Sequence, residues 1–371
     1  MSSHRLKVLM STGPLKKLDN PYVQQLVTAL SEQIDVEPLS WRATLFSRPD
    51  VFHVQWPDAL YRANGRPKTA VKRVLSAVLL ARLRARGVPV VLTVHNVASH
   101  EEEHGVERRL LRRLERMITL RIYLNESKEN DPTRGVVILH GDYRAWLRKQ
   151  KVDTSPREPD QDVILFGWLR RYKAIECLIA AARDAGATLT VSGRAIEAPY
   201  ERSLRVMIAD TPSAFLDTRY REDAELTAEI LRHRLVCLPY PNMYNSGALL
   251  YALSVGRPVL APRSPSNEAI AREVGEQWLA LYDGPLTAAT LRDALNRIPT
   301  VGSPNLSRRD WSTGISLHIA CYRTLAGATH GRRLPSTIAR ALIEADPAFA
   351  AHSAFNSPAR PCTPCNKSAP N

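Results

Sequence analysis

The chain has 371 residues, of which 44% are apolar and 24% are charged. These fractions exclude a chain that is disordered throughout, and no run of about 18 or more apolar residues predicts a membrane-spanning helix. The formal net charge of +14 indicates an anionic partner: nucleic acid, phosphorylated small molecules or an anionic membrane surface. Since domains usually contain roughly 100 to 200 residues, the length predicts two domains and a tail.

Residues 1–148 alternate between predicted strands and helices. Asn20 and Pro21 are typical of a helix start, because an Asn side chain caps the first turn and proline fits the first helical position. Helices are also predicted at 68–86 and around 108–117, and strands at 6–10, 50–56, 88–96, 121–125 and 136–142. This alternation predicts an α/β fold with a parallel, doubly wound sheet covered by helices on both faces.

A polar, proline-containing stretch at 149–161 shows no apolar periodicity and is predicted to be an interdomain linker. The alternation restarts in 162–309, with strands predicted at 162–169, 187–193, 213–220, 235–240 and 257–262. Two Rossmann-like domains would then face a cleft, and ligands bind such sheets at the carboxyl ends of the strands. A helix within 310–335 is predicted to cross back over the linker, and 336–371 to hold one short helix and a disordered tail.

Basic residues are concentrated between Arg66 and Arg121, where thirteen Lys/Arg stand against five Asp/Glu. In 72–87 and 108–117 they interleave with apolar positions, which predicts amphipathic helices. Two interpretations remain open: a solvated helix face, or a surface that rests on anionic lipid headgroups. A nucleic-acid-binding protein is disfavoured, because only 6% of the residues are aromatic and no nucleic-acid module is recognisable.

A polar corner, Asn245-Ser246-Gly247, separates the predicted strand at 235–240 from an apolar helix. We expect Asn245 to supply the capping side chain, Ser246 a hydroxyl and Gly247 a position without Cβ. Backbone N–H groups and the positive helix end could then approach an anion closely. A simple helix cap is the alternative interpretation.

The stretch GWLRRYK, Gly167 to Lys173, ends a predicted strand of the same domain. Its cations would lie at the same carboxyl edge as the polar corner, opposite a helix N-terminus. That arrangement suits a pyrophosphate whose negative charge grows as it leaves. The two stretches together predict a phosphate site formed by Gly167, Arg170, Lys173, Asn245, Ser246 and Gly247.

Strand ends of the first domain carry polar residues at His53–Asp58 and at His95–Glu101. A carboxylate or imidazole that faces the cleft can take a proton from an attacking hydroxyl, so the candidates for catalysis are Asp58, His95 and Glu101. Each also has a plain alternative role as a cleft-lining or helix-capping group. The segment His140–Asp142 is predicted to be a tight turn before the linker.

Several other kinds of site are disfavoured. Cys362 and Cys365 have CxxC spacing, but no second pair accompanies them, so a zinc site is not expected. Asp160 and Asp162 resemble paired aspartates that hold a metal in some sugar-nucleotide enzymes, yet they precede their strand, whereas ligands bind at its other end. The absence of GxxxxGK[ST], HExxH and GxSxG motifs disfavours a P-loop enzyme, a zinc protease and a serine hydrolase.

Two stretches, FGWLRRYKAIECLI and LPYPNMYNSGALLYALSVGRPVLAP, resemble the glycosyltransferases of the two-Rossmann-domain (GT-B) architecture. In chain order, HVQWPD, TVHNVASHEE, ILHGDYRAWL and SNEAIAREVGEQWLALYDG are similar to the mannosyltransferases of xanthan exopolysaccharide biosynthesis, and the similarity runs from about Leu6 to Tyr322. The resemblance implies transfer of mannose from GDP-mannose, with inversion, to a polyprenyl-diphosphate-linked oligosaccharide. It also implies a peripheral location on the cytoplasmic face of the cell membrane, where the basic helices would meet anionic lipid.

Under this resemblance, residues 1–148 would bind the acceptor and 162–309 the nucleotide sugar. Glu101 is then the preferred base and Asp58 the alternative, while His95 contacts a sugar. The phosphate site would stabilise the leaving diphosphate without a metal ion or other cofactor. Further acceptor or sugar contacts are expected at Gly13, Trp56, Asn96 and His100.

The resemblance has one departure and leaves two rivals. The large retaining GT-B families carry two glutamates about eight positions apart on the helix that follows the polar corner, and the corresponding places in this chain hold Met243 or Tyr244 and Tyr251. A retaining mechanism of that type is therefore not expected. The rivals are a GT-B transferase that uses another donor, such as a UDP-sugar, and a sugar-nucleotide epimerase or hydrolase, which would convert the donor alone.

Overall fold

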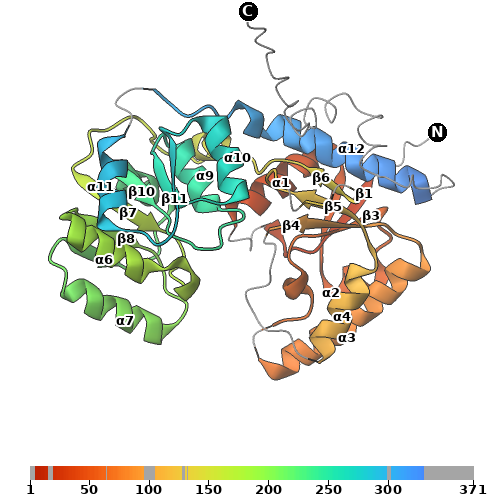
Figure 1. Ribbon diagram of the computed structural model, residues 1–371. Helices are drawn as coiled ribbons and strands as arrows, with labels where there is room; N and C mark the ends of the chain where they lie inside the picture. The colour runs from red at the N-terminus through yellow and green to blue at the C-terminus, as the bar shows by residue number, and fades with distance from the viewer. Residues whose placement is uncertain are drawn as a thin grey trace, which may run out of the picture.

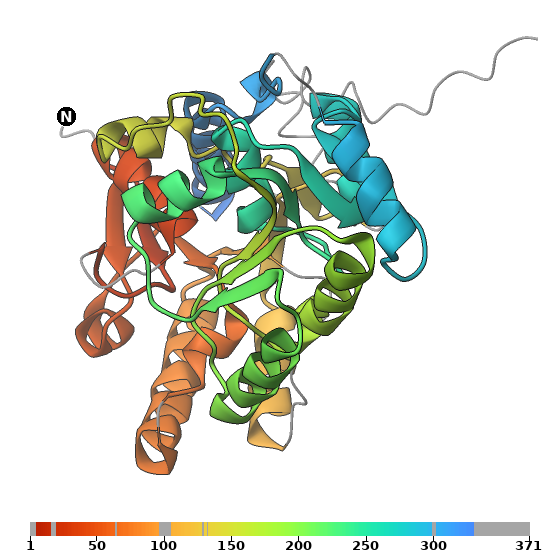
Figure 2. The same ribbon diagram turned by 90° about the vertical axis from the view of Figure 1, so that its left-hand side faces the viewer.

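The computed structural model describes residues 5–15, 20–63, 65–95, 105–127, 130–131, 133–298 and 302–329. Within those ranges the strands form two six-stranded sheets, and the strand pairs in both sheets are parallel. Figure 1 shows the two sheets in two α/β bodies that lie side by side, and in Figure 2 the second body lies in front of the first. The predicted fold class, two Rossmann-like sheets with helices around them, is confirmed.

The first sheet has the order β2-β1-β3-β4-β5-β6. Its strands are β1 (Lys7–Met10), β2 (Asp35–Pro38), β3 (Val51–Val54), β4 (Val90–Val94), β5 (Ile118–Tyr123) and β6 (Gly135–Val137). The accompanying helices are α1 (Pro21–Gln33), α2 (Trp41–Phe46), the 3-10 helix η2 (Pro57–Leu60), α3 (Arg66–Ala85) and α4 (Val106–Glu115). Helix α5 (Arg144–Lys149) follows β6 in the chain, but its Leu147 is buried in the core of the second sheet. Neither β2 nor α2 is predicted from the sequence, because both are short and partly exposed, so their apolar residues show no clear period.

The second sheet has the order β12-β11-β10-β7-β8-β9. Its strands are β7 (Gln161–Phe166), β8 (Leu189–Ser192), β9 (Ala214–Asp217), β10 (His233–Cys237), β11 (Val259–Pro262) and β12 (Leu279–Tyr282). The helices of this part are η3 (Arg171–Lys173), α6 (Ile175–Ala185), α7 (Ala198–Ala209), α8 (Asp223–Leu231), α9 (Gly247–Ser254), α10 (Pro265–Val274), α11 (Ala288–Asn296) and η4 (Ser307–Arg309).

Local sequence explains where α1 begins. The side chain of Asn20 accepts hydrogen bonds from the backbone N–H groups of Tyr22 and Val23, which have no partner within the helix. Pro21 lies in the first turn, where its missing N–H costs nothing. The predicted cap is confirmed, and it places Tyr22 at the end of the helix nearest the carboxyl edge of the first sheet.

The last described helix, α12 (Trp311–Thr329), packs on the first sheet although it follows the second in the chain. Ile315, Ile319 and Tyr322 are buried in the same apolar core as Val8 of β1. Figure 1 shows α12 lying along the first sheet. Residues 330–335, and the short helix and tail predicted for 336–371, lie outside the described residues.

Two connections cross between the sheets, and they contact each other. The buried Arg309 pairs with Glu273 of α10 at 2.8 Å and donates to the backbone carbonyl of His140 at 3.2 Å. The indole of Trp311 donates to the carbonyl of Asp142 at 2.8 Å. A Cβ on Gly141 would lie 2.4 Å from the Trp311 ring, so only glycine allows this approach. The segment predicted to be a simple turn, His140–Asp142, is thus part of the junction between the two sheets.

Candidate active site

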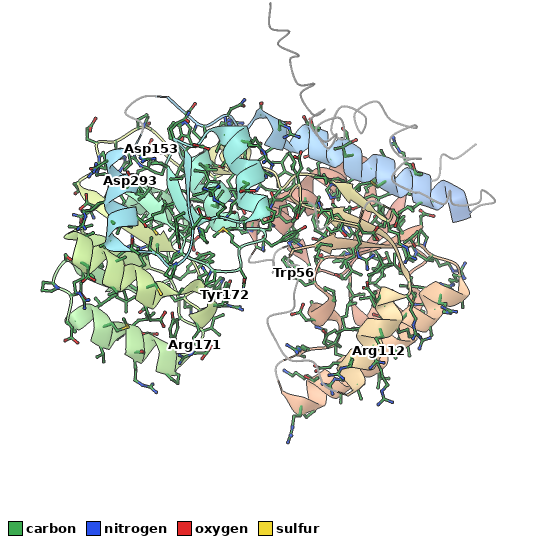
Figure 3. The ribbon with its side chains drawn as sticks, viewed as in Figure 1. Trp56, Arg112, Asp153, Arg171, Tyr172 and Asp293 are labelled. Atoms are coloured by element: carbon green, nitrogen blue, oxygen red, sulfur yellow. The ribbon has the colours of Figure 1, made fainter. Side chains whose placement is uncertain are left out.

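The carboxyl ends of the strands in the two sheets lie close together across the junction. Asn125, which follows β5, donates its side-chain amide to the carbonyl of Tyr244 at 3.0 Å and to the side-chain oxygen of Asn245 at 3.2 Å. Tyr244 in turn donates its hydroxyl to the side chain of Asn130 at 3.1 Å. Figure 3 shows Trp56 and Tyr172 on the facing sides of the two bodies. These contacts bring the predicted acceptor and donor sides together.

The polar corner forms the N-terminus of α9, with one correction. The cap is Ser246, whose hydroxyl oxygen accepts from the backbone N–H of Leu249 at 3.2 Å. The expectation that Asn245 supplies the cap is wrong, because its side chain is turned to Asn125 of the other body. The sequence does not decide between Asn245 and Ser246 as the cap of α9, because Asn and Ser are both favoured at this position.

Gly247 is the first residue of α9, and it borders a residue that the sequence did not point to. A Cβ on Gly247 would lie 3.0 Å from the hydroxyl of Tyr143, which is closer than most real Cβ contacts. Tyr143 is buried, and burial raises the pKa of its phenol. The missing Cβ therefore lets a neutral donor hydroxyl approach the positive end of α9.

Lys173 is buried at the end of η3, which follows the carboxyl end of β7 in the second sheet. It is 6% exposed, and its Nζ lies 4.8 Å from the centre of the Tyr240 ring. Burial, and next the repulsion of the exposed Arg170, lower the pKa of Lys173 to about 7. Among the described residues no carboxylate pairs with this amine, and the buried hydroxyl of Tyr240 has no hydrogen-bond partner.

Two glycines, Gly167 and Gly193, lie at the strand ends near Lys173 and allow close backbone contacts there. Gly167 follows β7 with φ of +93°, and a Cβ there would lie 3.6 Å from the amine of Lys173. Gly193 follows β8, and a Cβ there would lie 1.9 Å from the carbonyl oxygen of Gly167. The two strand ends can meet this closely only because both residues are glycine. Gly193 was not predicted from the sequence.

On the acceptor side, His95 lies at the end of β4 among aromatic rings. Its imidazole stacks on Trp56, with the ring centres 4.2 Å apart and an interplanar angle of 17°. Tyr22 approaches it edge-on at 5.7 Å. Burial, and next the charge of His140, lower the pKa of His95 to about 3, so this imidazole is neutral near pH 7.

The remaining predicted residues of the first body are placed as follows. Asp58 is exposed in the first turn of η2, directly after Trp56 and Pro57, and it attracts the ammonium of Lys72. Gly13 is exposed in the loop after β1. The structure therefore brings Trp56 and His95 together, and Asp58 lies two positions after Trp56 in the chain. Three predicted residues lie outside the described residues: Asn96, His100 and Glu101.

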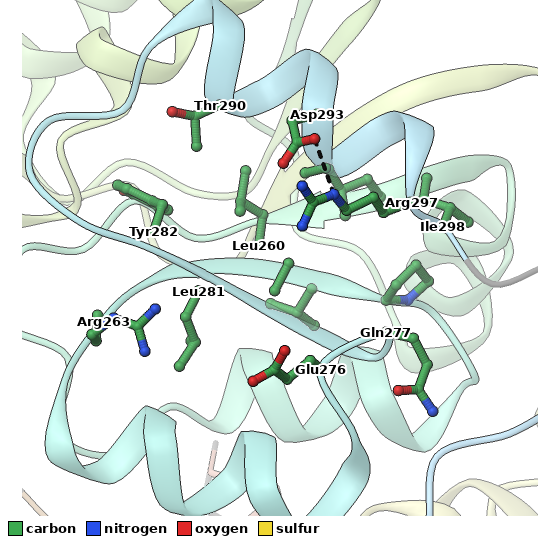
Figure 4. Close-up of a pocket in the computed structure, with 15 residues that line it drawn as sticks. Leu260, Arg263, Glu276, Gln277, Leu281, Tyr282, Thr290, Asp293, Arg297 and Ile298 are labelled. Atoms are coloured by element: carbon green, nitrogen blue, oxygen red, sulfur yellow. Dashed lines mark ion pairs between the residues drawn. The ribbon is translucent and has the colours of Figure 1, made fainter.

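Two other places do not belong to the candidate site. Asp160 pairs with Arg232 and Asp162 with Arg234 at the beginning of β7, away from its carboxyl end. A groove of about 410 Å³ lies beside β12 and α11 (Figure 4), lined by residues such as Arg263, Tyr282 and Asp293. None of the predicted site residues lines it.

In the described part of the chain, no group of three or more His, Cys, Asp or Glu side chains is arranged to hold a metal ion. In the same residues, no helix is both long enough and apolar enough to cross a membrane.

No family model matches the chain. A curated protein from Xanthomonas campestris pv. campestris, GDP-mannose:glycolipid 4-beta-D-mannosyltransferase, is 38% identical over 332 residues, which cover 87% of this chain and 93% of that protein. The structure is also similar to sucrose-phosphate synthase from Thermosynechococcus elongatus (TM-score 0.60, 14% identity, 87% and 100% of the two chains). AviGT4, a glycosyltransferase involved in avilamycin A biosynthesis, gives a TM-score of 0.54 at 15% identity over 87% and 98%. The chain belongs to the glycosyltransferase family of the curated mannosyltransferase and has the GT-B fold.

Proposed function

We propose that this glycosyltransferase moves mannose from GDP-mannose, with inversion, to a polyprenyl-diphosphate-linked oligosaccharide in exopolysaccharide synthesis. The donor and the glycolipid acceptor follow from the name of the 38% identical relative. The observation that supports the chemistry is a pair of neighbouring buried residues of the second body: Lys173, whose amine forms no ion pair among the described residues, and Tyr240, whose hydroxyl has no hydrogen-bond partner there.

A donor diphosphate would supply what these groups lack. A buried cation and a buried hydroxyl both destabilise a protein unless they are paired. Lys173 and Tyr240 can bind phosphate oxygens, and the free N–H groups at the start of α9 add the positive end of the helix. Because Gly167 and Gly247 lack a Cβ, they let the Lys173 amine and the Tyr143 hydroxyl lie close to the backbone at these two positions. Arg170, which is exposed at the same edge, adds a second cation.

The reaction transfers one glycosyl group. The acceptor oxygen attacks the anomeric carbon, the bond from that carbon to the phosphate oxygen breaks on the opposite face, and GDP leaves with the electron pair. The acceptor proton passes to a carboxylate of the first body, Glu101 or Asp58. Lys173 and Arg170 stabilise the growing charge of the leaving diphosphate, so no metal ion is required in this mechanism.

The acceptor sugar would rest on the first body. The stacked rings of Trp56 and His95 offer an apolar face and a polar edge at the end of two neighbouring strands. At the positions where retaining relatives carry glutamates, Met243 is buried and Tyr251 is bonded through its hydroxyl to Thr227 at 2.9 Å. Neither offers a carboxylate to the donor, which supports inversion.

The surface formed by α2, α3 and α4, here called the basic apolar face, would rest on anionic lipid at the cytoplasmic side of the membrane. Helix α3 packs on both α2 and α4, and Figure 1 shows the three together at one end of the first body. Trp41 and Phe46 are 62% and 70% exposed on α2, and Val74 of α3 is 64% exposed. Arg112 is exposed on α4 and points away from the first sheet (Figure 3). Exposed aromatic groups next to arginines suit a headgroup surface.

The test is a transfer assay with radiolabelled GDP-mannose and a lipid-linked oligosaccharide. The proposal expects label in the lipid fraction, a β linkage by NMR of the released sugar, and loss of transfer in Lys173→Met. Lys149→Met, an exposed lysine at the end of α5, is the matched control and should keep full activity. Conversion of GDP-mannose without any acceptor would indicate an epimerase or hydrolase instead. Transfer from UDP-sugars alone would overturn the mannose assignment.

A further inference from the structure

A chain of hydrogen bonds runs from α12 through the first sheet to His95. The hydroxyl of Tyr322 lies 2.7 Å from Nδ1 of His53 in β3. The Nε2 atom of His53 lies 2.7 Å from the hydroxyl of Thr93 and 3.2 Å from the side-chain nitrogen of Gln55. The side-chain oxygen of Gln55 lies 3.0 Å from Nε2 of His95.

The direction of this chain follows from the amide in its middle. The nitrogen of Gln55 can only donate, so Nε2 of His53 accepts and carries no proton. The oxygen of Gln55 can only accept, so Nε2 of His95 donates and carries the proton. Burial lowers the pKa of His53 well below its usual value and that of His95 to about 3. Both rings are therefore neutral, and each carries one proton, on either Nδ1 or Nε2.

We propose that Gln55 is a positioning residue, which holds the proton of His95 on Nε2 and thereby leaves the lone pair of Nδ1 for a substrate. Within the described residues, Nδ1 of His95 takes part in no hydrogen bond, while Nε2 is committed to Gln55. Stacking on Trp56 fixes the plane of the ring. The substrate group that Nδ1 accepts from is a hydroxyl of the acceptor sugar, and this last step rests on the proposed function.

Packing alone does not explain a glutamine at this position. Gln55 is completely buried, and a buried amide is costly unless both of its ends are bonded. The backbone N–H of Gln55 donates to the hydroxyl of Ser11 at 2.9 Å, so the side chain is not needed to satisfy that N–H group. A methionine would fill similar space but could neither donate to His53 nor accept from His95.

The first test reads the tautomer directly and needs no substrate. In protein labelled with ¹⁵N-histidine, a two-bond ¹H–¹⁵N spectrum distinguishes Nε2–H from Nδ1–H rings, and the His95→Gln variant identifies the signals of His95. The proposal expects the Nε2–H tautomer for His95 near pH 7. A proton on Nδ1, or a mixture of both tautomers, would overturn it. Since no substrate is present, this result is independent of whether the proposed transfer occurs.

The second test is Gln55→Met with Gln25→Met as the matched control. Gln25 lies in α1 of the same body, and its side-chain nitrogen has no hydrogen-bond partner. We expect Gln55→Met to give His95 mixed tautomers and to raise KM for the acceptor about tenfold, the effect of losing one well-placed hydrogen bond, with GDP binding unchanged. Gln25→Met should change neither. If Gln55→Met keeps a single His95 tautomer and the wild-type acceptor KM, the positioning role is wrong; if that variant does not fold, the wild-type spectrum alone decides.

Discussion

The donor and acceptor sides of the candidate site differ in whether their buried polar side chains are paired. On the donor side, within the described residues, the buried Lys173 forms no ion pair and the buried hydroxyl of Tyr240 has no hydrogen-bond partner. On the acceptor side, His53 and Gln55 are also buried, but each is bonded at both ends of its side chain. In the proposed mechanism an anion completes the donor side, whereas on the acceptor side the buried groups behind His95 are already paired and hold its neutral ring in place.

The largest expected effect separates the two carboxylates on the acceptor side. Replacing the true base with the matching amide, in Glu101→Gln or Asp58→Asn, should lower turnover by about two to four orders of magnitude and leave GDP binding nearly intact. The other replacement should change turnover by less than about tenfold. Steady-state kinetics with a GDP-binding measurement on both variants makes the distinction. Equal, small losses in both would mean that neither carboxylate takes the proton.

The next effect concerns the charge on the donor side. An ordinary lysine keeps its proton to a pKa of 10.5, and in this protein the pKa of Lys173 is lowered to about 7. A bound diphosphate stabilises the protonated amine, so GDP binding at pH 8 should take up a proton, and its affinity should fall as pH rises above about 7. Calorimetry in two buffers of different ionisation enthalpy measures that uptake. Lys173→Met should abolish it, and an unchanged uptake in that variant would place the titrating group elsewhere.

For the protein without ligand, the lowered pKa of Lys173 predicts the opposite pH dependence: the free energy of unfolding rises with pH, whereas GDP affinity falls. Between pH 7 and 10.5 the unfolded chain binds more protons at this residue than the folded chain does, so the free energy of unfolding should rise with pH in that window. Below pH 7 the amine is protonated in both states, and burying its charge lowers the free energy of unfolding by the full amount. Lys173→Met should therefore raise Tm near pH 7 by roughly 2 to 4 °C, which corresponds to about 1 kcal/mol. A lower Tm would show that the amine is paired in the free protein.

Affinity for anionic membranes should fall by about tenfold in a variant that alters neither the donor side nor the acceptor side of the site. The double variant Trp41→Ser, Phe46→Ser removes two exposed aromatic side chains from the basic apolar face. Co-sedimentation with vesicles that contain phosphatidylglycerol measures the effect. Tyr220→Ser, which removes a side chain that is 70% exposed in the second body, is the control and should bind as wild type does.

The smallest effect tests the contact between Tyr143 and the first residue of α9, Gly247. In Gly247→Ala the new methyl group would lie 3.0 Å from the Tyr143 hydroxyl, and GDP affinity should fall roughly three- to tenfold as the hydroxyl is displaced. Adding Tyr143→Phe should recover part of that loss, because the crowding atom is gone. A double-mutant cycle measures the coupling, and strictly additive losses would show that the two residues act separately.

The comparison also explains what the sequence predicts and what it does not. The apolar runs that form β1 and β4 lie inside a parallel sheet with most of their side chains buried, and such strands are visible in the sequence as continuous apolar stretches. The donor side is local in sequence, because strand ends and a helix start within a few residues of each other in the chain. The stretch Gly167–Lys173 and the polar corner can therefore be proposed as site residues from the sequence alone.

The acceptor side is assembled from distant segments, and there the prediction stops. Asn125 and Asn245 are 120 positions apart, and Tyr322 reaches His53 across 269 positions. No local pattern encodes such a pair. The choice between Asn245 and Ser246 as the cap failed for the same reason, since the partner that draws Asn245 away lies in the other body. Single residues such as Gln55 acquire a role only through that packing.

The most direct measurement is a thermal-shift panel of GDP, UDP, ADP and dTDP, with and without EDTA, on the wild type and on Lys173→Met. The account predicts stabilisation of the wild type by GDP, no effect of EDTA on that stabilisation, and its loss in the variant. Stabilisation by UDP instead would keep the site and overturn the mannose donor. No response to any nucleotide would contradict the claim that a diphosphate completes the buried groups beside α9.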